Sequence, residues 1–460
     1  MSIRFHDTYK KRTVNFEPIN KGKVSLYTCG PTVYDYAHVG NLRYFIFEDT
    51  LRRTLEAFGF KVKHIMNTTD VGHLTSDEDE GEDKIEKGAK REQKTVWEVA
   101  EYYTKRFLAD AESLNILKPN KLAPATKHIK EIIEIVEKLI EKGCAYETDQ
   151  AVYFEVSKFP DYERLTGQKL SEKKVGVRQE VVVDNQKRHP ADFAVWFKAA
   201  GRFAHHTMRW QSPWGAGFPG WHIECSAISR KYLGQPFDIH TGGVDHISVH
   251  HANEIAQSTA AYDLPLANNW LHSEFLLVEG QKMSKSLGNL LTLEQIKARG
   301  FLPVDFRYLV LTSHYRNKLN FTWEGLGAAS HAFHNLKAEI EEYDKATKPD
   351  DNYLNQFGEA LANDLDTPRA LSILWEMVRE SDLPTTVKRA TVNQMDEVLG
   401  LGLKNLKAEP IPKEVKNLLH ERDKARNLKD WTLADQIRRK IEDFGFDVDD
   451  TAKGSKAKKR

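Results

Sequence analysis

Four side chains suited to bind a metal ion stand at widely separated positions in the 460-residue chain. Cys29 follows an apolar run, residues 24–28, and Cys225 lies within 219-PGWHIECSAIS-229. In 246-HISVHHANEIAQ-257, His250 and Glu254 are four residues apart, which places both side chains on one face of a helix. Two thiolates, an imidazole and a carboxylate make a reasonable tetrahedral zinc site, although spacing alone does not establish one.

The same residues have structural interpretations that the sequence pattern leaves open. A single buried cysteine is usually inert packing, and a His/Glu pair at i, i+4 is usually a surface contact. His251 is a rival ligand, because it stands three residues before Glu254 on the same predicted helix.

A second group, His38-Val39-Gly40-Asn41, is suited to bind phosphate. Gly40 lets a ligand approach the backbone closely, and the helix predicted from Leu42 onwards offers free N–H groups and a positive dipole end. His38 can donate a hydrogen bond to a phosphate oxygen as negative charge develops on it. A histidine before a glycine is also common for structural reasons, so this motif carries little weight alone.

A third group is 281-QKMSKSLGN-289, in which Lys282 and Lys285 are three residues apart. Two lysines with serines and a glycine between apolar flanks suit a mobile loop that grips polyphosphate. The alternative is a surface loop that happens to be basic.

The elements that must position these groups follow an α/β pattern. One helical face that ends at Gly59 is predicted by apolar residues at steps of three and four, namely Tyr44, Phe47, Leu51, Leu55 and Phe58. Residues 61–66 predict the next strand, so strand, helix and strand form a βαβ unit within a parallel sheet. The loop from Cys29 to Asn41 then lies at the carboxyl end of a strand, where open α/β sheets bind ligands.

Other segments change in character along the chain. Between residues 145 and 215, the short runs AVYFEV, EVVVD and DFAVWF predict an inserted module that contains β-strands. The α/β pattern returns at FDIH and continues into the helix predicted for HHANEIAQSTAAY. Beyond about residue 325 the pattern is mainly helical, and the basic tail SKAKKR is expected to fray.

The composition is that of an ordinary soluble globular protein, with 40% hydrophobic and 29% charged residues. We expect no membrane span, because no apolar run reaches the roughly 18 residues that one needs. The start of the chain lacks the apolar core of a signal peptide, and three cysteines form no disulfide framework. A cytoplasmic protein is therefore expected.

The order and separation of the motifs resemble those of class I aminoacyl-tRNA synthetases, with HVGN in place of the HIGH pattern and a complete KMSKS. Six stretches are together similar to the cysteinyl-tRNA synthetase family: TCGPTVYDYAHVGN, NTTDVGHL, PGWHIECSAIS, DIHTGGVD, HHANEIAQS and QKMSKSLGN. The resemblance runs over essentially the whole chain.

The resemblance implies a Rossmann-like parallel-sheet catalytic domain with an inserted connective domain, followed by a mainly helical C-terminal half. It implies six parts: 1–125, first half of the catalytic domain; 126–214, connective insertion; 215–278, second half; 279–325, KMSKS-bearing stem-contact region; 326–405, helical bundle; 406–460, anticodon-binding domain. A monomer with no obligate protein partner is expected by the same analogy.

The implied reaction activates L-cysteine with ATP to cysteinyl-adenylate and transfers it to the 3′ end of tRNA(Cys). The family's zinc ligands match Cys29, Cys225, His250 and Glu254, and its cysteine contacts match Gly30, Thr69, Trp221 and His240. The ATP contacts match His38, Gly40, Asn41, Gly243, Asp245 and Lys285, with Mg²⁺ accompanying ATP. Catalysis is assigned to His38, Asn41, Lys282 and Lys285.

Anticodon recognition is implied for a basic helical segment and its neighbour, through Arg426, Trp431, Asp435 and Asp450. A solvated amphipathic helix is the structural alternative there. The chain departs from the family pattern at Asn41, which replaces a histidine and cannot be charged, and also at Phe218, Ala252 and the C-terminal tail.

Two other functions fit part of the pattern. A mycothiol-type cysteine ligase shares the catalytic core but lacks an anticodon-binding end, and residues 406–450 argue against it. An inactive RNA-binding paralogue has no need of the metal ligands or the KMSKS lysines, and all of them are present.

Overall fold

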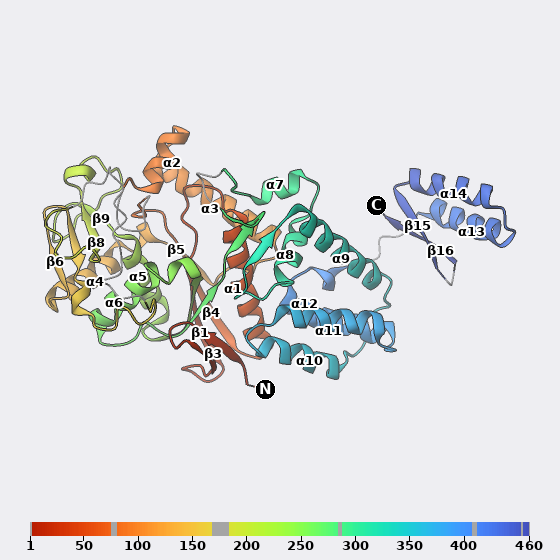
Figure 1. Cartoon of the computed structure of the whole chain (residues 1–460), viewed down its shortest axis with the longest axis horizontal. Helices are drawn as coiled ribbons and strands as arrows, with labels where there is room; N and C mark the ends of the chain where they lie inside the picture. The colour runs from red at the N-terminus through yellow and green to blue at the C-terminus, as the bar shows by residue number, and fades with distance from the viewer. Residues whose placement is uncertain are drawn as a thin grey trace.

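A five-stranded parallel sheet forms the centre of the N-terminal half in this computed structural model, which describes residues 2–74, 81–167, 184–283, 288–406, 412–451 and 454–459 (Figure 1). Its strand order is β11-β10-β3-β4-β5. The strands span Lys23–Thr28 (β3), Lys61–Thr68 (β4), Lys121–Pro124 (β5), Phe237–Gly243 (β10) and Ala267–Ser273 (β11). The predicted α/β fold with a parallel sheet is confirmed.

The helix predicted after the HVGN motif is α1, Val39–Ala57, which connects β3 to β4. Leu51 and Leu55 pack against the sheet residues Leu26 and Ile239, as the periodicity predicted. The apolar surface of α1 is wider than that one face, because Leu42 and Ile46 belong to a second cluster shared with the helical half. The helix ends at Phe58, and Gly59 follows with a positive φ of 86°.

A four-stranded antiparallel sheet, β6-β7-β8-β9, lies between β5 and β10 in the sequence. Its strands are Ala145–Glu147, Ala151–Phe154, Phe193–Lys198 and Gly217–Pro219. Two of the three predicted β-like runs are therefore strands, and most of the third, EVVVD, lies outside the described residues. The helices around both sheets are α2 (Lys84–Glu92), α3 (Val96–Ser113), α4 (Ile129–Glu141), α5 (Trp221–Leu233) and α6 (His250–Tyr262).

The rest of the chain is mainly helical, as expected. A small three-stranded sheet follows the parallel sheet in the sequence. Its strands are β12 (Leu276–Val278), β13 (Gln281–Lys282) and β14 (Leu319–Phe321). The helices of this part of the chain are α7 (Leu293–Ala298), α8 (Pro303–Leu311), α9 (Trp323–Glu341), α10 (Asp351–Ala362), α11 (Thr367–Glu380) and α12 (Thr385–Leu399). Within the described part of the chain, no helix is both long and apolar enough to cross a membrane.

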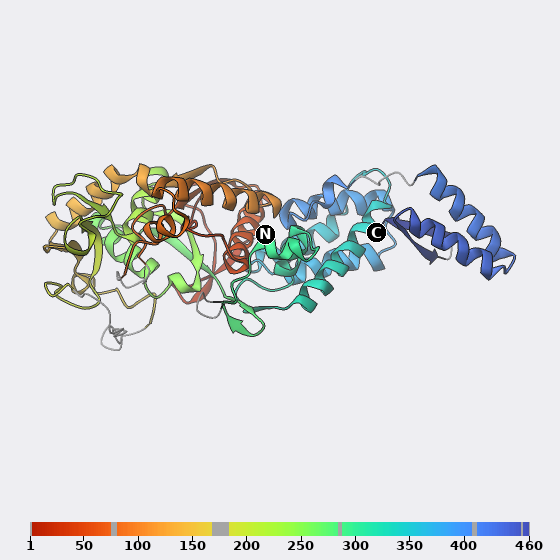
Figure 2. The ribbon, with the colours of Figure 1, turned by 90° about the horizontal axis from the view of Figure 1, so that it is seen from above.

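The C-terminal unit consists of α13 (Lys413–Asn427), α14 (Trp431–Asp443), β15 (Phe446–Thr451) and β16 (Gly454–Lys459). It lies beyond α9–α12 in both views of the ribbon (Figures 1 and 2). The expectation of a frayed tail is wrong, because Gly454–Lys459 pairs with β15 in an antiparallel hairpin. A second hairpin, β1 (Arg4–Asp7) with β2 (Arg12–Asn15), lies at the other end of the chain.

Candidate active site and metal centre

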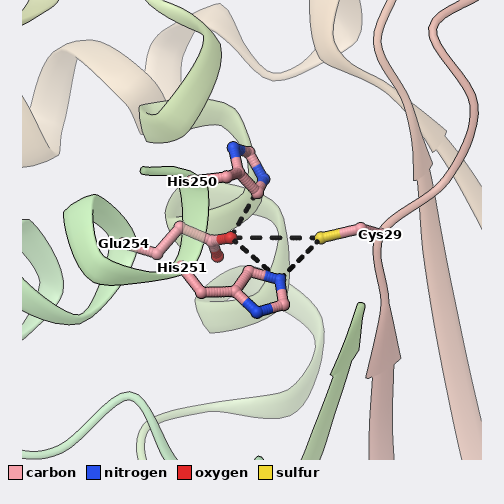
Figure 3. Close-up of side chains that lie close together, drawn as sticks. All are labelled: Cys29, His250, His251 and Glu254. Atoms are coloured by element: carbon pink, nitrogen blue, oxygen red, sulfur yellow. Dashed lines mark hydrogen bonds and ion pairs between the residues drawn. The ribbon is translucent and has the colours of Figure 1, made fainter. Parts of the chain in front are cut away.

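A buried cluster of potential metal ligands lies at the carboxyl edge of the parallel sheet. It contains Cys29, which directly follows β3, together with His250, His251 and Glu254 of α6 (Figure 3). One donor atom from each of the four lies within 4.8 Å of the other three, and every side chain is buried. Residues more than 200 positions apart therefore meet because parallel strands end at a common edge.

The distances within the cluster suit a tetrahedral ion. Glu254 Oε1 lies 3.0 Å from His250 Nε2 and 4.0 Å from the sulfur of Cys29. The Cys29 sulfur lies 3.3 Å from His251 Nε2. Because zinc bonds of roughly 2.0–2.3 Å separate tetrahedral donors by roughly 3.3–3.8 Å, the donor set and its spacing fit a zinc ion.

Cys225, the fourth ligand expected from the resemblance, lies beside this cluster rather than within the group of four. It is buried on α5 and interacts with Cys29 and His250. Burial opposes ionisation of its thiol, but the hydrogen bond from Cys29 and the charge of His250 outweigh burial and lower its pKa to about 6. Both His251 and Cys225 therefore remain candidates for the fourth position.

Neighbouring imidazoles contact His250 and His251, the two histidines of the cluster. His250 Nδ1 lies 2.9 Å from His222 Nδ1, and His251 Nδ1 lies 2.7 Å from His272 Nε2. The Nε2 atom of each ligand histidine is thereby left facing Glu254 or Cys29. Supporting contacts of this kind fix the orientation of metal-binding histidines in proteins.

The charge of the cluster is set by Glu254. Burial disfavours its ionised form, but His240 and His250 outweigh burial and lower the pKa of this carboxyl to about 2. The other oxygen of Glu254, Oε2, lies 3.0 Å from His240 Nε2, so His240 is hydrogen-bonded to a member of the cluster.

The HVGN turn forms the N-terminus of α1. His38 is the N-cap residue, and its Nδ1 accepts a hydrogen bond from the Asn41 N–H at 3.2 Å. Asn41 Oδ1 accepts one in return from the His38 N–H, also at 3.2 Å, which completes a capping box. The amide at position 41 thus has an observed structural role, and the bond to Nδ1 places the proton of a neutral His38 ring on Nε2.

The turn and the KMSKS segment are in contact. A Cβ atom at Gly40 would lie 2.7 Å from Met283 Cε, so glycine allows the methionine side chain to approach this backbone closely. The Val39 N–H donates to Leu291 O at 2.8 Å, beyond the motif. Lys282 is exposed, with Nζ 4.5 Å from the centroid of Phe275, and Lys285 lies outside the described residues.

Three of the four expected cysteine contacts, Gly30, Trp221 and His240, adjoin members of the cluster. Gly30 is packed so tightly that a Cβ would lie 1.8 Å from the backbone oxygen of Asn67. Trp221 begins α5 and stacks on His250 with ring centroids 4.3 Å apart. Thr69 is buried and donates its hydroxyl hydrogen to Glu224, and His240 bonds to the ligand carboxylate as described above.

The expected nucleoside contacts lie at the same edge of the sheet. Gly243 ends β10, and Asp245 follows in a short 3₁₀ turn. A Cβ at Gly243 would meet Asp245 Oδ1 at 2.3 Å, so the two residues form one tight loop.

In the C-terminal unit, three of the four expected anticodon residues are close together. Asp450 accepts a hydrogen bond from Arg426 at 2.7 Å, and the Arg426 guanidinium lies 5.8 Å from the centroid of Trp431. Trp431 is 56% exposed, whereas Asp435 is exposed farther along α14. The sequence analysis missed Arg422, a buried arginine that holds Asp450 with Nη1 at 2.5 Å.

Comparison with known proteins identifies the family. Residues 15–331 match the family model for the catalytic domain of "tRNA synthetases class I (C)". The chain is 47% identical over 459 residues to cysteine–tRNA ligase 1 of Burkholderia lata, covering 99% of this chain and 97% of the relative. The chain belongs to the cysteine–tRNA ligase family. It is 42% identical over 491 residues to the cysteine–tRNA ligase of Treponema denticola, with 98% of each chain covered.

Members of the cysteine–tRNA ligase family are class I aminoacyl-tRNA synthetases, and this chain is an enzyme of that class. Its fold is also similar to a solved methionyl-tRNA synthetase of Mycobacterium tuberculosis bound by methionyl-adenylate. The TM-score is 0.59 at 15% identity, over 83% of this chain and 93% of that one.

One further polar residue of this cysteine–tRNA ligase family member escaped the sequence analysis. Glu224 lies inside the PGWHIECS motif, between Trp221 and Cys225, and is 1% exposed. An acidic residue on the same helical face as Trp221, a candidate site residue, was the available signal. It was not used, because acidic residues on helices are usually exposed.

Proposed function

We propose that this enzyme attaches L-cysteine to tRNA(Cys) in two steps. In the first, the cysteine carboxylate attacks the α-phosphorus of Mg²⁺–ATP, which forms cysteinyl-adenylate and releases pyrophosphate. In the second, a hydroxyl of the terminal adenosine of the tRNA attacks the acyl carbon, which forms cysteinyl-tRNA and releases AMP. The proposal is carried by one observation, the buried thiol-containing cluster at the end of strand β3, which leads into the HVGN turn, in a chain of this family.

Residues of the turn and the KMSKS segment would stabilise the charge that develops on phosphate in the first step. Asn41 holds the His38 ring through Nδ1, and the Nε2–H of His38 is assigned to the α-phosphate. Lys282 and Lys285 are assigned to the phosphates, and Gly40, Gly243 and Asp245 to the bound nucleotide. Such a site works by positioning and by charge stabilisation.

The proposed metal is zinc, held by Cys29, Cys225, His250 and Glu254. When bound, zinc supplies a soft Lewis acid that favours the thiolate of cysteine over the hydroxyl of serine. This preference is needed because a purely apolar pocket separates near-isosteric side chains only weakly, on the order of 100-fold. Two thiols, with the pKa of one lowered to about 6, support this ligand set over one that contains a single thiol.

In this arrangement His251 does not bind the metal. Its Nε2 lies 3.3 Å from the Cys29 sulfur, and it would orient that thiolate by a hydrogen bond. Gly30, Thr69, Trp221 and His240 are assigned to the bound cysteine. In the C-terminal unit, Arg426, Trp431, Asp435 and Asp450 are assigned to the anticodon of the tRNA, since aromatic and polar side chains grip unstacked bases.

The test is aminoacylation of tRNA(Cys) by purified, zinc-loaded protein with ATP, Mg²⁺ and labelled cysteine, with labelled serine as the control. Label transferred to tRNA from cysteine but not from serine is the expected result. Cysteine-dependent pyrophosphate exchange without label on tRNA would mean that the core serves a different acceptor. Absence of both activities would mean that the enzyme does not act on cysteine.

A further inference from the structure

Glu224 is a buried carboxylate at the start of α5, and half of its hydrogen-bonding capacity is unused by the protein. Its Oε1 accepts hydrogen bonds from the Thr69 hydroxyl and from Asn67 Nδ2, the latter at 3.3 Å. Its Oε2 is also buried and has no hydrogen-bond partner in the part of the chain that the structure describes. Among the described residues, no lysine or arginine is paired with Glu224. A buried carboxylate is costly without a compensating positive charge, so this oxygen is poised for a cation.

The neighbours of Glu224 place that cation in the amino-acid site. Thr69 is itself assigned to the bound cysteine. Asn67 Oδ1 accepts a hydrogen bond at 2.8 Å from the N–H of Gly30, and Gly30 is also assigned to the bound cysteine. Trp221 lies one turn before Glu224 on the same face of α5, and stacks on His250. The Glu224 carboxyl group is therefore linked by hydrogen bonds to Asn67 and Thr69, at the end of β4, and through Asn67 to Gly30, just after β3.

The hydrogen bonds also fix the direction of the Thr69 hydroxyl. Thr69 gives its only hydroxyl hydrogen to Glu224, and its oxygen accepts one hydrogen bond from Asn67 Nδ2 at 3.1 Å, which leaves one lone pair on that oxygen as a further acceptor. Burial raises the pKa of Glu224 well above its usual range, and a cation next to Oε2 would favour the ionised form. In that form Thr69 Oγ1 and Glu224 Oε2 are a pair of acceptors that carries a negative charge. An ammonium group, which offers three donors and no acceptor, is the chemical complement of such a pair.

We propose that Glu224 binds the α-ammonium group of the substrate amino acid, directly through Oε2 and indirectly through the Thr69 hydroxyl that it orients. This inference rests on the proposed function, in which the substrate is cysteine. It assigns recognition of the amino group to Glu224 and leaves recognition of the thiol to the metal cluster. The enzyme then distinguishes an α-amino thiol from a thiol acid that lacks the amino group.

The test compares binding of L-cysteine with binding of 3-mercaptopropionate, which has the same thiol and carboxylate but no amino group. Dissociation constants are measured by calorimetry on zinc-loaded enzyme, with zinc content determined for every preparation. For Glu224→Gln we expect cysteine to bind about 10- to 100-fold more weakly, with little change for 3-mercaptopropionate. The preference for cysteine, which is the dissociation constant of 3-mercaptopropionate divided by that of cysteine, therefore falls by the same factor.

Glu48→Gln is the matched control. Glu48 is another buried carboxylate with an unpartnered Oε2, but its Oε1 accepts from Thr241 within the sheet. Its replacement should leave the ratio unchanged. Thr69→Val provides a second route if Glu224→Gln does not fold, because it removes the oriented acceptor and keeps the carboxylate. It should lower the same ratio.

An unchanged ratio in a folded Glu224→Gln enzyme, or an equal loss of both ligands, would overturn the inference, because a structural role affects the two ligands alike. Failure of the proposed function is seen separately in the unmodified enzyme, as the absence of cysteine-dependent pyrophosphate exchange.

Discussion

The metal cluster and the C-terminal unit are assembled in opposite ways. The cluster joins Cys29 after β3 to three residues of α6, more than 200 positions later, and all four side chains are buried. The C-terminal unit brings Arg422, Arg426, Trp431 and Asp450 together within 29 consecutive positions, and Trp431 remains exposed. A buried polar site thus depends on the whole sheet, whereas the exposed site depends on one hairpin of helices and its adjoining strands.

This difference predicts how each region responds to substitution. Removal of a buried ligand leaves other buried polar groups without a partner, so its effects should be large and shared across the cluster. Replacement of an exposed side chain loses only the contact that it makes with a bound partner. Four substitutions test this contrast, in order of decreasing expected effect.

Cys29→Ser should abolish stoichiometric zinc binding and slow cysteine-dependent pyrophosphate exchange more than about 100-fold. This exceeds the loss typical for residues that merely support a ligand. Zinc content by mass spectrometry and the exchange rate are the measurements. Cys144→Ser is the control, because that half-buried cysteine lies outside the cluster. A Cys29→Ser enzyme that keeps one zinc per chain would contradict the assignment.

Lys285→Ala should slow adenylate formation by about 100-fold, as expected when one charge-stabilising donor is lost, and leave cysteine binding nearly intact. Pyrophosphate exchange and calorimetric titration with cysteine measure the two effects. This substitution tests a third case beside the buried cluster and the C-terminal unit, because Lys285 is assigned to catalysis but belongs to a short local motif. An unchanged rate would remove Lys285 from the mechanism.

His251→Asn should retain zinc with about 10-fold lower affinity, because His251 is proposed to orient Cys29 rather than bind the metal. Cys225→Ser in parallel should lose zinc. Competition with a chelator gives both affinities. The reverse pattern, with zinc lost from the His251 variant and kept by the Cys225 variant, would exchange their roles.

Trp431→Ala should raise KM for tRNA(Cys) about 5-fold, the lower end of the effect of one base-stacking contact, with pyrophosphate exchange unchanged. Steady-state aminoacylation measures the first quantity. Phe444→Ala is the control, because Phe444 is an exposed aromatic at the other end of α14. Equal effects of both substitutions would indicate a general loss of surface packing instead of base recognition.

Much of the fold followed from local patterns. The βαβ unit around α1 was predicted from apolar periodicity and Gly59, because helix and strand periods are properties of the chain itself. The hairpin of β15 and β16 was not, since the apolar alternation of Phe446 and Val448 is short and the basic tail offers only Ala457 to match it.

The sequence by itself determined which chemical groups this protein has: three cysteines, the HVGN turn, two KMSKS lysines and a helix with two adjacent histidines and a glutamate. Residue type and short-range spacing are enough for that. Only the tertiary structure decided which groups meet. It brought His251 close to Cys29 and placed Cys225 beside them. It also paired Asn41 with His38 and left one buried oxygen of Glu224 without a hydrogen-bond partner among the described residues. These contacts arise where separate strands and helices end at a shared edge, and sequence spacing carries no record of that convergence.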